Sequence, residues 1–222
     1  MSTPLLPQAF WFRVSIPCQR VDGLPRTVPR GKLLDLPESC ALPDLAQLEG
    51  GRSWAEVRIA WNPAGLAVAI EATGKLGPIH FEEGPTLSNG AQIWIDTRDT
   101  RNIHRASRFC HRFTAKLAPG GARTALDVEL AQRPIARAVA DAPMCAIETL
   151  TTRAERLSDG WRLEIFIPSE ALHGFDPETN RRLGFAYQVS DPDREDQFLA
   201  VGREVPIGED PSLWSTLELL EP

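Results

Sequence analysis

The sequence predicts an all-β fold, an antiparallel β-sandwich of the jelly-roll kind with about ten strands. Three observations support this prediction. Apolar and polar residues alternate with a period of two over residues 54–61, which is typical of a strand with one buried face. Turn-forming residues separate this run from a second alternating run, and more short apolar runs follow at near-regular spacing. No helical periodicity persists for the roughly 12 residues that would indicate a long helix.

The clearest element is a β-hairpin. Residues 54–61 and 66–70 are joined by Asn62-Pro63-Ala64-Gly65, a composition that favours a tight turn. Further strands are expected at 91–96, 107–117, 124–131, 146–157, 161–167, 183–190 and 213–220. One helical turn at most is expected at each of 43–48 and 169–172.

The amino-terminal part has a different character. Many of the 19 prolines punctuate the first 45 residues, which favours an extended, irregular segment over helices. Within it, residues 10–16 are compatible with one strand. We expect a single domain over residues 1–222, with an N-terminal wrap at 1–50 and the sandwich core at 51–222.

Composition and net charge limit the kinds of partner that the chain is expected to bind. Of the 222 residues, 42% are hydrophobic and 24% are charged, which is typical of a globular protein. The net charge of −6 opposes bulk binding to nucleic acid or anionic membranes, so neither is expected as a partner. The sequence has no apolar run of about 20 residues and no basic start followed by an apolar core, so a cytoplasmic location is expected.

The four cysteines are Cys18, Cys40, Cys110 and Cys145. None belongs to a C-x-x-C pair, which argues against zinc-ribbon and thioredoxin-like sites. Reduced, partly buried thiols are therefore expected, and a bridge between Cys18 and Cys40 in an exported protein is the alternative.

A basic segment stands out in this acidic protein. Residues 96–113 hold five arginines and two histidines against two aspartates. If residues 107–113 form a strand, Arg108, Cys110 and Arg112 share one face, and the opposite face with its two phenylalanines belongs to the core. Guanidinium groups match carboxylates and phosphates, so the open face predicts a site for an anionic ligand such as a uronate, a sulfated sugar or a phosphate.

A simpler interpretation of the same segment stays open. The strand is then a solvated edge strand, and its arginines pair with acids of a neighbouring strand such as Asp127 and Glu129.

Metal and thiol chemistry have weaker support. Asp96 and Asp99 are candidates for a structural calcium site, and the acidic run 191–196 is another, for which a solvated polar loop is the simpler explanation. No other cofactor is expected. Cys110 and His104 are a conceivable nucleophile and base. His111 is expected to be a hydrogen-bonded histidine of the core.

Four segments in order carry a family resemblance: residues 60–70, then Q-I-W-I-D at 92–96, then G-W-R-L-E-I-F-I-P at 160–168, then L-G-F-A-Y-Q-V-S-D at 183–191. From about residue 54 to 220 the chain resembles the family 9 carbohydrate-binding modules and the wider DOMON-like sandwiches. The resemblance implies a β-sandwich that grips a sugar between two tryptophans, and it implies structural calcium in many relatives. It also implies methionine-ligated haem in some relatives, but only Met1 and Met144 are present, so haem is not expected.

The positions that the resemblance assigns to the sugar differ in this sequence. Thr86 and Gly208 stand where the family has its two tryptophans. Gln92 stands where the family has a glutamate, and the family's arginine falls near Cys110, between two arginines of this chain. The residues expected at the ligand site are Gln92, Trp94, Arg98, Arg101, His104, Arg105, Arg108, Cys110 and Arg112.

The tryptophans fall into two groups according to their place in the alternation of apolar and polar residues. Trp61 and Trp161 are in phase with aliphatic residues and are expected in the core, whereas Trp54 and Trp94 fall on the polar phase and are candidates for exposure. We therefore expect a non-catalytic module that binds a carbohydrate or an anionic sugar-like ligand. A structural or protein-interaction domain is the first alternative, with a protein partner in place of a small molecule, and a thiol-dependent enzyme is the second.

Overall fold

The computed structural model describes residues 8–11, 14–27, 31–75, 77–81, 87–121 and 125–221. The strands are β1 (Ser15–Arg20), β2 (Ala55–Asn62), β3 (Gly65–Ala72), β4 (Gly90–Asp96), β5 (Cys110–Pro119), β6 (Leu126–Gln132), β7 (Thr151–Leu157), β8 (Gly160–Pro168), β9 (Arg182–Ser190), β10 (Gln197–Phe198) and β11 (Ser215–Leu219). The helices are short 3₁₀ turns: η1 (Gln8–Trp11), η2 (Glu38–Cys40), η3 (Leu45–Glu49), η4 (Ile147–Thr149), η5 (Ser169–Ala171) and η6 (Pro211–Leu213).

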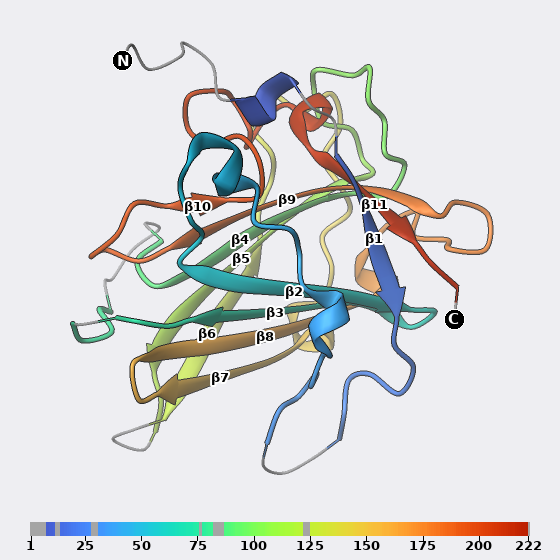
Figure 1. The fold of residues 1–222 in the computed structure, drawn as a ribbon. Coiled ribbons are helices and arrows are strands. Elements are labelled where there is room, and N and C mark those ends of the chain that lie inside the picture. The colour runs from blue at the N-terminus through green and yellow to red at the C-terminus, as the bar shows by residue number, and fades with distance from the viewer. Residues whose placement is uncertain are drawn as a thin grey trace, which may run out of the picture.

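The strands form one continuous hydrogen-bonded sheet that folds into two layers. Their order is β10-β9-β11-β1-β2-β3-β8-β7-β6-β5-β4, and β9 also pairs with β4, so the sheet closes on itself. Figure 1 shows β2, β3, β8 and β7 in one layer, in front of β4, β5 and β6 in the other. The pairings are antiparallel except that β1 runs parallel to β11 and to β2. The prediction of an all-β sandwich is confirmed.

The core lies between the layers. Alternate side chains of each strand point inward, so Ile93 of β4, Phe113 of β5 and Phe185 of β9 pack against the opposing layer. Trp61 and Trp161 belong to the same core, as predicted. The side chains of β4, β5 and β9 that point away from the core form the outer face of their layer. The candidate site lies on this outer face.

The N-terminal segment is tied into the sandwich. The expected strand at 10–16 begins only at Ser15, and residues 12 and 13 lie outside the described residues. The buried carboxylate of Glu164 accepts hydrogen bonds from the backbone N–H groups of Leu33 (2.7 Å) and Leu34 (3.1 Å). These leucines pack with Phe166 on the outer side of β8, so the segment covers one face of that layer.

Most predicted elements are present with shifted ends. The hairpin of β2 and β3, the strands β4, β8 and β9, and the turns η3 and η5 match the prediction closely. Two strands start late because the preceding residues form 3₁₀ turns: β7 follows η4, and β11 follows η6. The two-residue β10 was not predicted, because so short a run has no periodicity.

All four cysteines are free; Cys18, Cys40 and Cys110 are buried, and Cys145 is half-buried. The predicted reduced thiols are confirmed, and the alternative bridge between Cys18 and Cys40 is not formed. None of the helices within the described ranges is long and apolar enough to cross a membrane.

His111 is a buried core histidine, as predicted. Its ring stacks with Phe113 at 6.2 Å between centroids, and Nε2 lies 3.4 Å from the carbonyl oxygen of His173. Burial lowers the pKa of His111 to about 4, so the folded protein holds the ring neutral at neutral pH.

This burial predicts an acid-sensitive fold. Between pH of about 6.5 and 4, the unfolded chain binds a proton at His111 that the folded protein does not bind. The free energy of unfolding therefore falls by up to about 3 kcal/mol as the pH falls through this window, and no such loss occurs above it. Denaturant unfolding at pH 7 and pH 4.5 measures the loss, which is expected to be smaller in His111→Phe and unchanged in the exposed-site control His104→Gln. Equal losses in all three proteins would contradict the assignment.

Candidate functional site

Strand β4 places a polar side chain between two neighbouring strands. In the β-sheet register, Gln92 lies opposite Gln188 of β9 and opposite Thr114 of β5. One step of two residues along β4, Trp94 lies opposite Arg112 of β5. Because side chains alternate along a strand, these residues share the outer face of the layer, away from the sandwich core.

The outer face carries a hydrogen-bonded chain of side chains that we call the polar row: Arg112, Gln92, Gln188 and Asp196. Arg112 donates to the side-chain oxygen of Gln92 through Nε (2.9 Å) and through Nη2. Gln92 donates to the side-chain oxygen of Gln188 (3.1 Å), and Gln188 donates to Asp196 (2.8 Å). Asp196 also pairs with Arg203, so the row joins strands β5, β4 and β9 to the loop beyond β9.

A pocket of about 850 Å³ opens at the Asp196 end of the polar row. Its walls combine charged, hydroxyl-bearing and aromatic side chains, including Trp54, Ser88, Asp191, Asp196, Phe198 and Arg203. Trp54 is half-buried; its indole N–H donates to the Glu195 carbonyl (3.0 Å), and the Arg194 guanidinium lies 5.0 Å from its ring. This mixture suits a ligand that has both apolar surface and many hydrogen-bonding groups.

The expected exposure of Trp94 is wrong. Its side chain is on the outer face but only 2% exposed, because it packs with Ile207 and Trp214 in a second apolar cluster. The chain that follows β10 folds over this part of the face, and a Cβ placed on Gly208 would lie 3.5 Å from the Trp94 ring. Alternation fixes which face a side chain is on, but it does not tell whether a loop covers that face.

Two solved structures are similar to this fold. A carbohydrate-binding module of family 9 from Caldicellulosiruptor kristjanssonii, in complex with cellotriose, has 16% sequence identity, a TM-score of 0.59, and coverage of 93% of this chain and 93% of that chain. A family 9 module from the same organism, in complex with glucose, has 17% identity and a TM-score of 0.51, and covers 76% of this chain and 77% of that chain. The chain has the fold of these modules. No family model and no curated protein matches the sequence.

The structure describes one of the two positions that the resemblance assigns to the sugar-gripping tryptophans. Gly208 lies beside the buried Trp94 ring and offers no aromatic surface of its own. Thr86 lies outside the described residues. The wider DOMON-like relationship stays a prediction.

The arginines of residues 96–113 do not converge on one site. Cys110 and Arg112 point to the outer face, but Arg108 lies in the turn before β5, which begins at Cys110 because the Cys110 N–H donates to the Ser107 carbonyl. The predicted common face of the two arginines is therefore wrong. Arg108 and Arg98 instead lie over the Phe109 ring, at 5.1 and 4.9 Å from its centroid.

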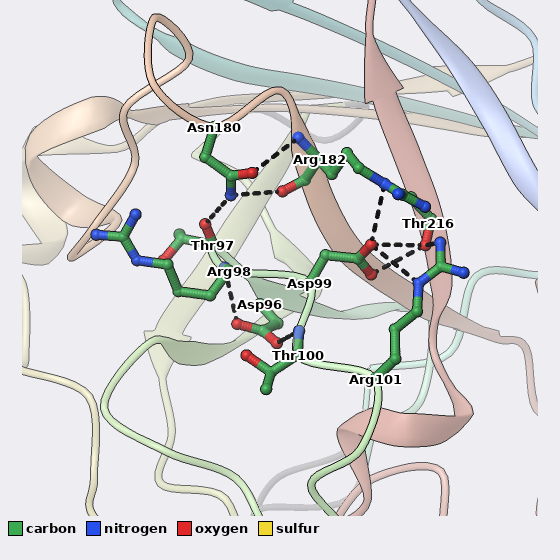
Figure 2. Close-up of polar contacts among 9 residues, drawn as sticks. All are labelled: Asp96, Thr97, Arg98, Asp99, Thr100, Arg101, Asn180, Arg182 and Thr216. Atoms are coloured by element: carbon green, nitrogen blue, oxygen red, sulfur yellow. Dashed lines mark hydrogen bonds and ion pairs between the residues drawn. The ribbon is translucent and has the colours of Figure 1, made fainter.

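The loop after β4 uses its charged groups to fix itself to β9 and β11. The Asp96 carboxylate accepts the backbone N–H groups of Arg98 (2.9 Å) and Thr100 (2.7 Å), and burial raises its pKa. Figure 2 shows Arg101 and Arg182 converging on Asp99, which also accepts the Thr216 hydroxyl at 2.9 Å. Arg98 extends away from both aspartates in the same view.

Few carboxylate oxygens of this loop are available to bind calcium, because protein donors already contact both Asp96 and Asp99. At the other candidate run, Lys75 bridges Asp191 and Asp193 with its ammonium group, at 2.6 Å from each. Within the described ranges, no cluster of three or more His, Cys, Asp and Glu residues could hold a metal ion. A structural calcium ion stays a prediction that these contacts do not favour.

The remaining predicted residues secure loops beside the outer face. His104 Nδ1 lies 3.0 Å from the Asp210 carboxylate, next to η6. Arg105 donates to the backbone carbonyls of Arg137 (2.7 Å) and Ala138 (3.4 Å). The alternative pairing with Asp127 and Glu129 is not found either, since among the described ion pairs neither acid contacts an arginine of this segment.

Three residues beside the predicted ones were missed. Gln188 belongs to a segment of the family resemblance, and its place on β9 sets it beside Gln92. Asp196 belongs to the acidic run that the sequence offers as a calcium candidate. Arg133 lies opposite Arg112 just beyond β6, where its N–H donates to the Arg112 carbonyl (2.8 Å). Each follows from strand register, which the sequence does not specify.

Among the residues that the structure describes, no histidine contacts the Cys110 thiol as the base that a thiol-dependent enzyme needs. The polar contacts of this thiol are with Ser107, whereas His104 contacts Asp210 and Ser212. Burial, and then the charge of Asp96, raise the pKa of the Cys110 thiol to about 12. A thiol with this pKa is a poor nucleophile near neutral pH.

This environment predicts slow thiol chemistry. In the native protein at pH 8, a cysteine-directed reagent is expected to modify Cys145 first, because it is half-buried while the other three are buried. All four thiols are expected to react after denaturation. Mass spectrometry of the labelled protein gives the count, and Cys145→Ser provides the control that abolishes the native-state signal. Rapid labelling of Cys110 in the folded protein would contradict this account.

Proposed function

We propose that the protein is a non-catalytic module that binds a carbohydrate or an anionic sugar-like ligand at the polar row and in the pocket beside it. The observation that carries the proposal is the polar row itself. Gln92, Gln188 and Arg112 present amide and guanidinium groups on one rigid face, where three adjacent strands hold them. Sites built on strands keep such groups in place better than sites built on loops.

The chemistry of the face suits a sugar. Hydroxyl groups both donate and accept hydrogen bonds, and side-chain amides have one acceptor and two donor positions to offer. The adjoining pocket supplies Trp54 and Phe198, whose rings match the apolar C–H faces of sugar rings. Its volume of about 850 Å³ falls within the range of roughly 300–1,000 Å³ found for small-molecule sites.

The similarity to solved structures supports the same proposal. The two family 9 modules that share this fold are described in complex with cellotriose and with glucose. In this chain the clamp position at Gly208 has no ring and Trp94 is buried, so we assign the stacking surface to Trp54 and Phe198.

One observation favours the alternative of a protein-interaction domain. Val139 (67% exposed) and Met144 (64% exposed) lie on the segment between β6 and η4. Exposed apolar side chains close in sequence favour a protein contact. Loss of a partner in the double variant Val139→Ser, Met144→Ser, with sugar binding intact, would support a protein-interaction role beside the sugar site.

The test of the proposed function is a titration with a panel of neutral and acidic mono- and oligosaccharides, followed by calorimetry and tryptophan fluorescence. Gln92→Ala and Gln188→Ala are each expected to weaken binding of the best ligand by about 10-fold, since each removes at least one hydrogen bond worth roughly 1–1.5 kcal/mol. Trp54→Ala is expected to weaken it and to reduce the fluorescence response.

A matched control is available on another strand. Gln19 is a half-buried glutamine of β1, a strand that β11 separates from β9 and that carries no residue of the polar row. Gln19→Ala is expected to leave affinity unchanged. If no sugar of the panel binds, or if Gln92→Ala and Gln188→Ala bind as tightly as the unaltered protein, the proposal is wrong.

A further inference from the structure

Two arginines face each other on the outer face without a carboxylate between them. Phe113 pairs with Gln132 in the β5–β6 register, so the next positions, Arg112 and Arg133, lie opposite each other, and their backbones are joined by the Arg133 N–H. Side chains directly opposite on neighbouring strands project to the same side. Both guanidinium groups therefore belong to the face that carries the polar row.

Neither guanidinium has an acidic partner among the described residues. Among the described residues, the polar contacts of Arg112 are its two hydrogen bonds to the neutral amide oxygen of Gln92. Its Nη1 group is not used in these bonds, and the ring of Trp94 lies 5.9 Å away. Arg133 likewise forms no ion pair with any acid in the described part of the chain.

The arrangement is unfavourable in the unliganded protein. Like charges directly opposite on adjacent strands destabilise a sheet. Arg112 is also half-buried, and both burial and the charge of Arg133 lower the pKa of its guanidinium. By contrast, Arg162 of β8 pairs with Glu71 and Glu155 on its two neighbouring strands. A charge left without a partner on a face otherwise lined by hydrogen-bonding groups indicates that the ligand supplies the anion.

We propose that Arg112 and Arg133 bind the carboxylate of an acidic sugar, a uronate, whose hydroxyl groups contact Gln92 and Gln188. Guanidinium groups recognise a planar carboxylate with paired hydrogen bonds, and the two groups together neutralise their mutual repulsion when the anion is bound. This inference rests on the proposed function, because it names the class of sugar that the same site takes. It also replaces the pair of arginines expected from the sequence: Arg133, and not Arg108, is the partner of Arg112.

The test compares glucose with glucuronate, two sugars that differ only in the oxidation of one carbon. Glucuronate is expected to bind at least about 10-fold more tightly, since charge-assisted hydrogen bonds are stronger than neutral ones. Its affinity is expected to fall with added salt, whereas that of glucose is not. Arg112→Gln and Arg133→Gln are each expected to remove most of the preference.

The matched control is Arg108→Gln, which removes an exposed arginine of the same segment that lies on Phe109 instead of the polar row. It is expected to keep the preference for glucuronate. A second readout needs no ligand: relief of the repulsion is expected to raise the thermal midpoint of unliganded Arg133→Gln by about 1–3 °C.

The outcomes separate the two proposals. If glucose binds as tightly as glucuronate, or if Arg133→Gln keeps the full preference, the acidic-sugar inference is overturned while sugar binding stands. If neither glucose, glucuronate nor the oligosaccharides bind, the proposed function fails and the inference fails with it. If acetate or sulfate binds as tightly as glucuronate, the arginines bind simple anions and the assignment to a sugar is overturned.

Discussion

The pairing of β4 with both β5 and β9 is the constraint on which the rest of the site depends. All seven residues of β4 are in register with both neighbours, so the outward side chain of Gln92 is fixed beside Gln188, and Trp94 is fixed beside Arg112. Because β9 also pairs with β11 and β10, the same strand connects this layer to the rest of the sandwich. A rigid outer face with defined positions follows from backbone hydrogen bonds alone, before any side chain makes a contact.

One part of the outer face is covered by an apolar cluster, and another part carries the polar row. At one end, the chain after β10 covers Trp94 with Ile207 and Trp214, and the ring that the sequence placed outside becomes part of a second core. At the other end, the polar row stays accessible and leads through Asp196 to the pocket near Trp54. The fold shared with the family 9 modules thus carries an outer face on which amide and guanidinium groups form the polar row.

The sequence predicted the elements whose signals are local. The hairpin of β2 and β3, strand β4 and the core positions of Trp61, Trp161 and His111 follow from alternation and turn residues. Contacts between distant segments were not predictable: the cover over Trp94 depends on residues more than 100 positions away, and the opposition of Arg112 and Arg133 depends on the register of β5 with β6. Arg108 was misplaced because a turn stabilised by Ser107 delays the start of β5, and three residues give no periodicity from which to detect that delay.

The most direct measurement follows the side-chain amides of the polar row during a titration. In an ¹⁵N-labelled sample, the account predicts saturable shifts of the Gln92 and Gln188 side-chain amide signals as glucuronate is added, with one affinity for both, and no shift of the Gln19 amide. Resonances that stay in place at Gln92 and Gln188 while the sugar binds elsewhere would contradict the assignment of the site to the outer face of β4, β5 and β9.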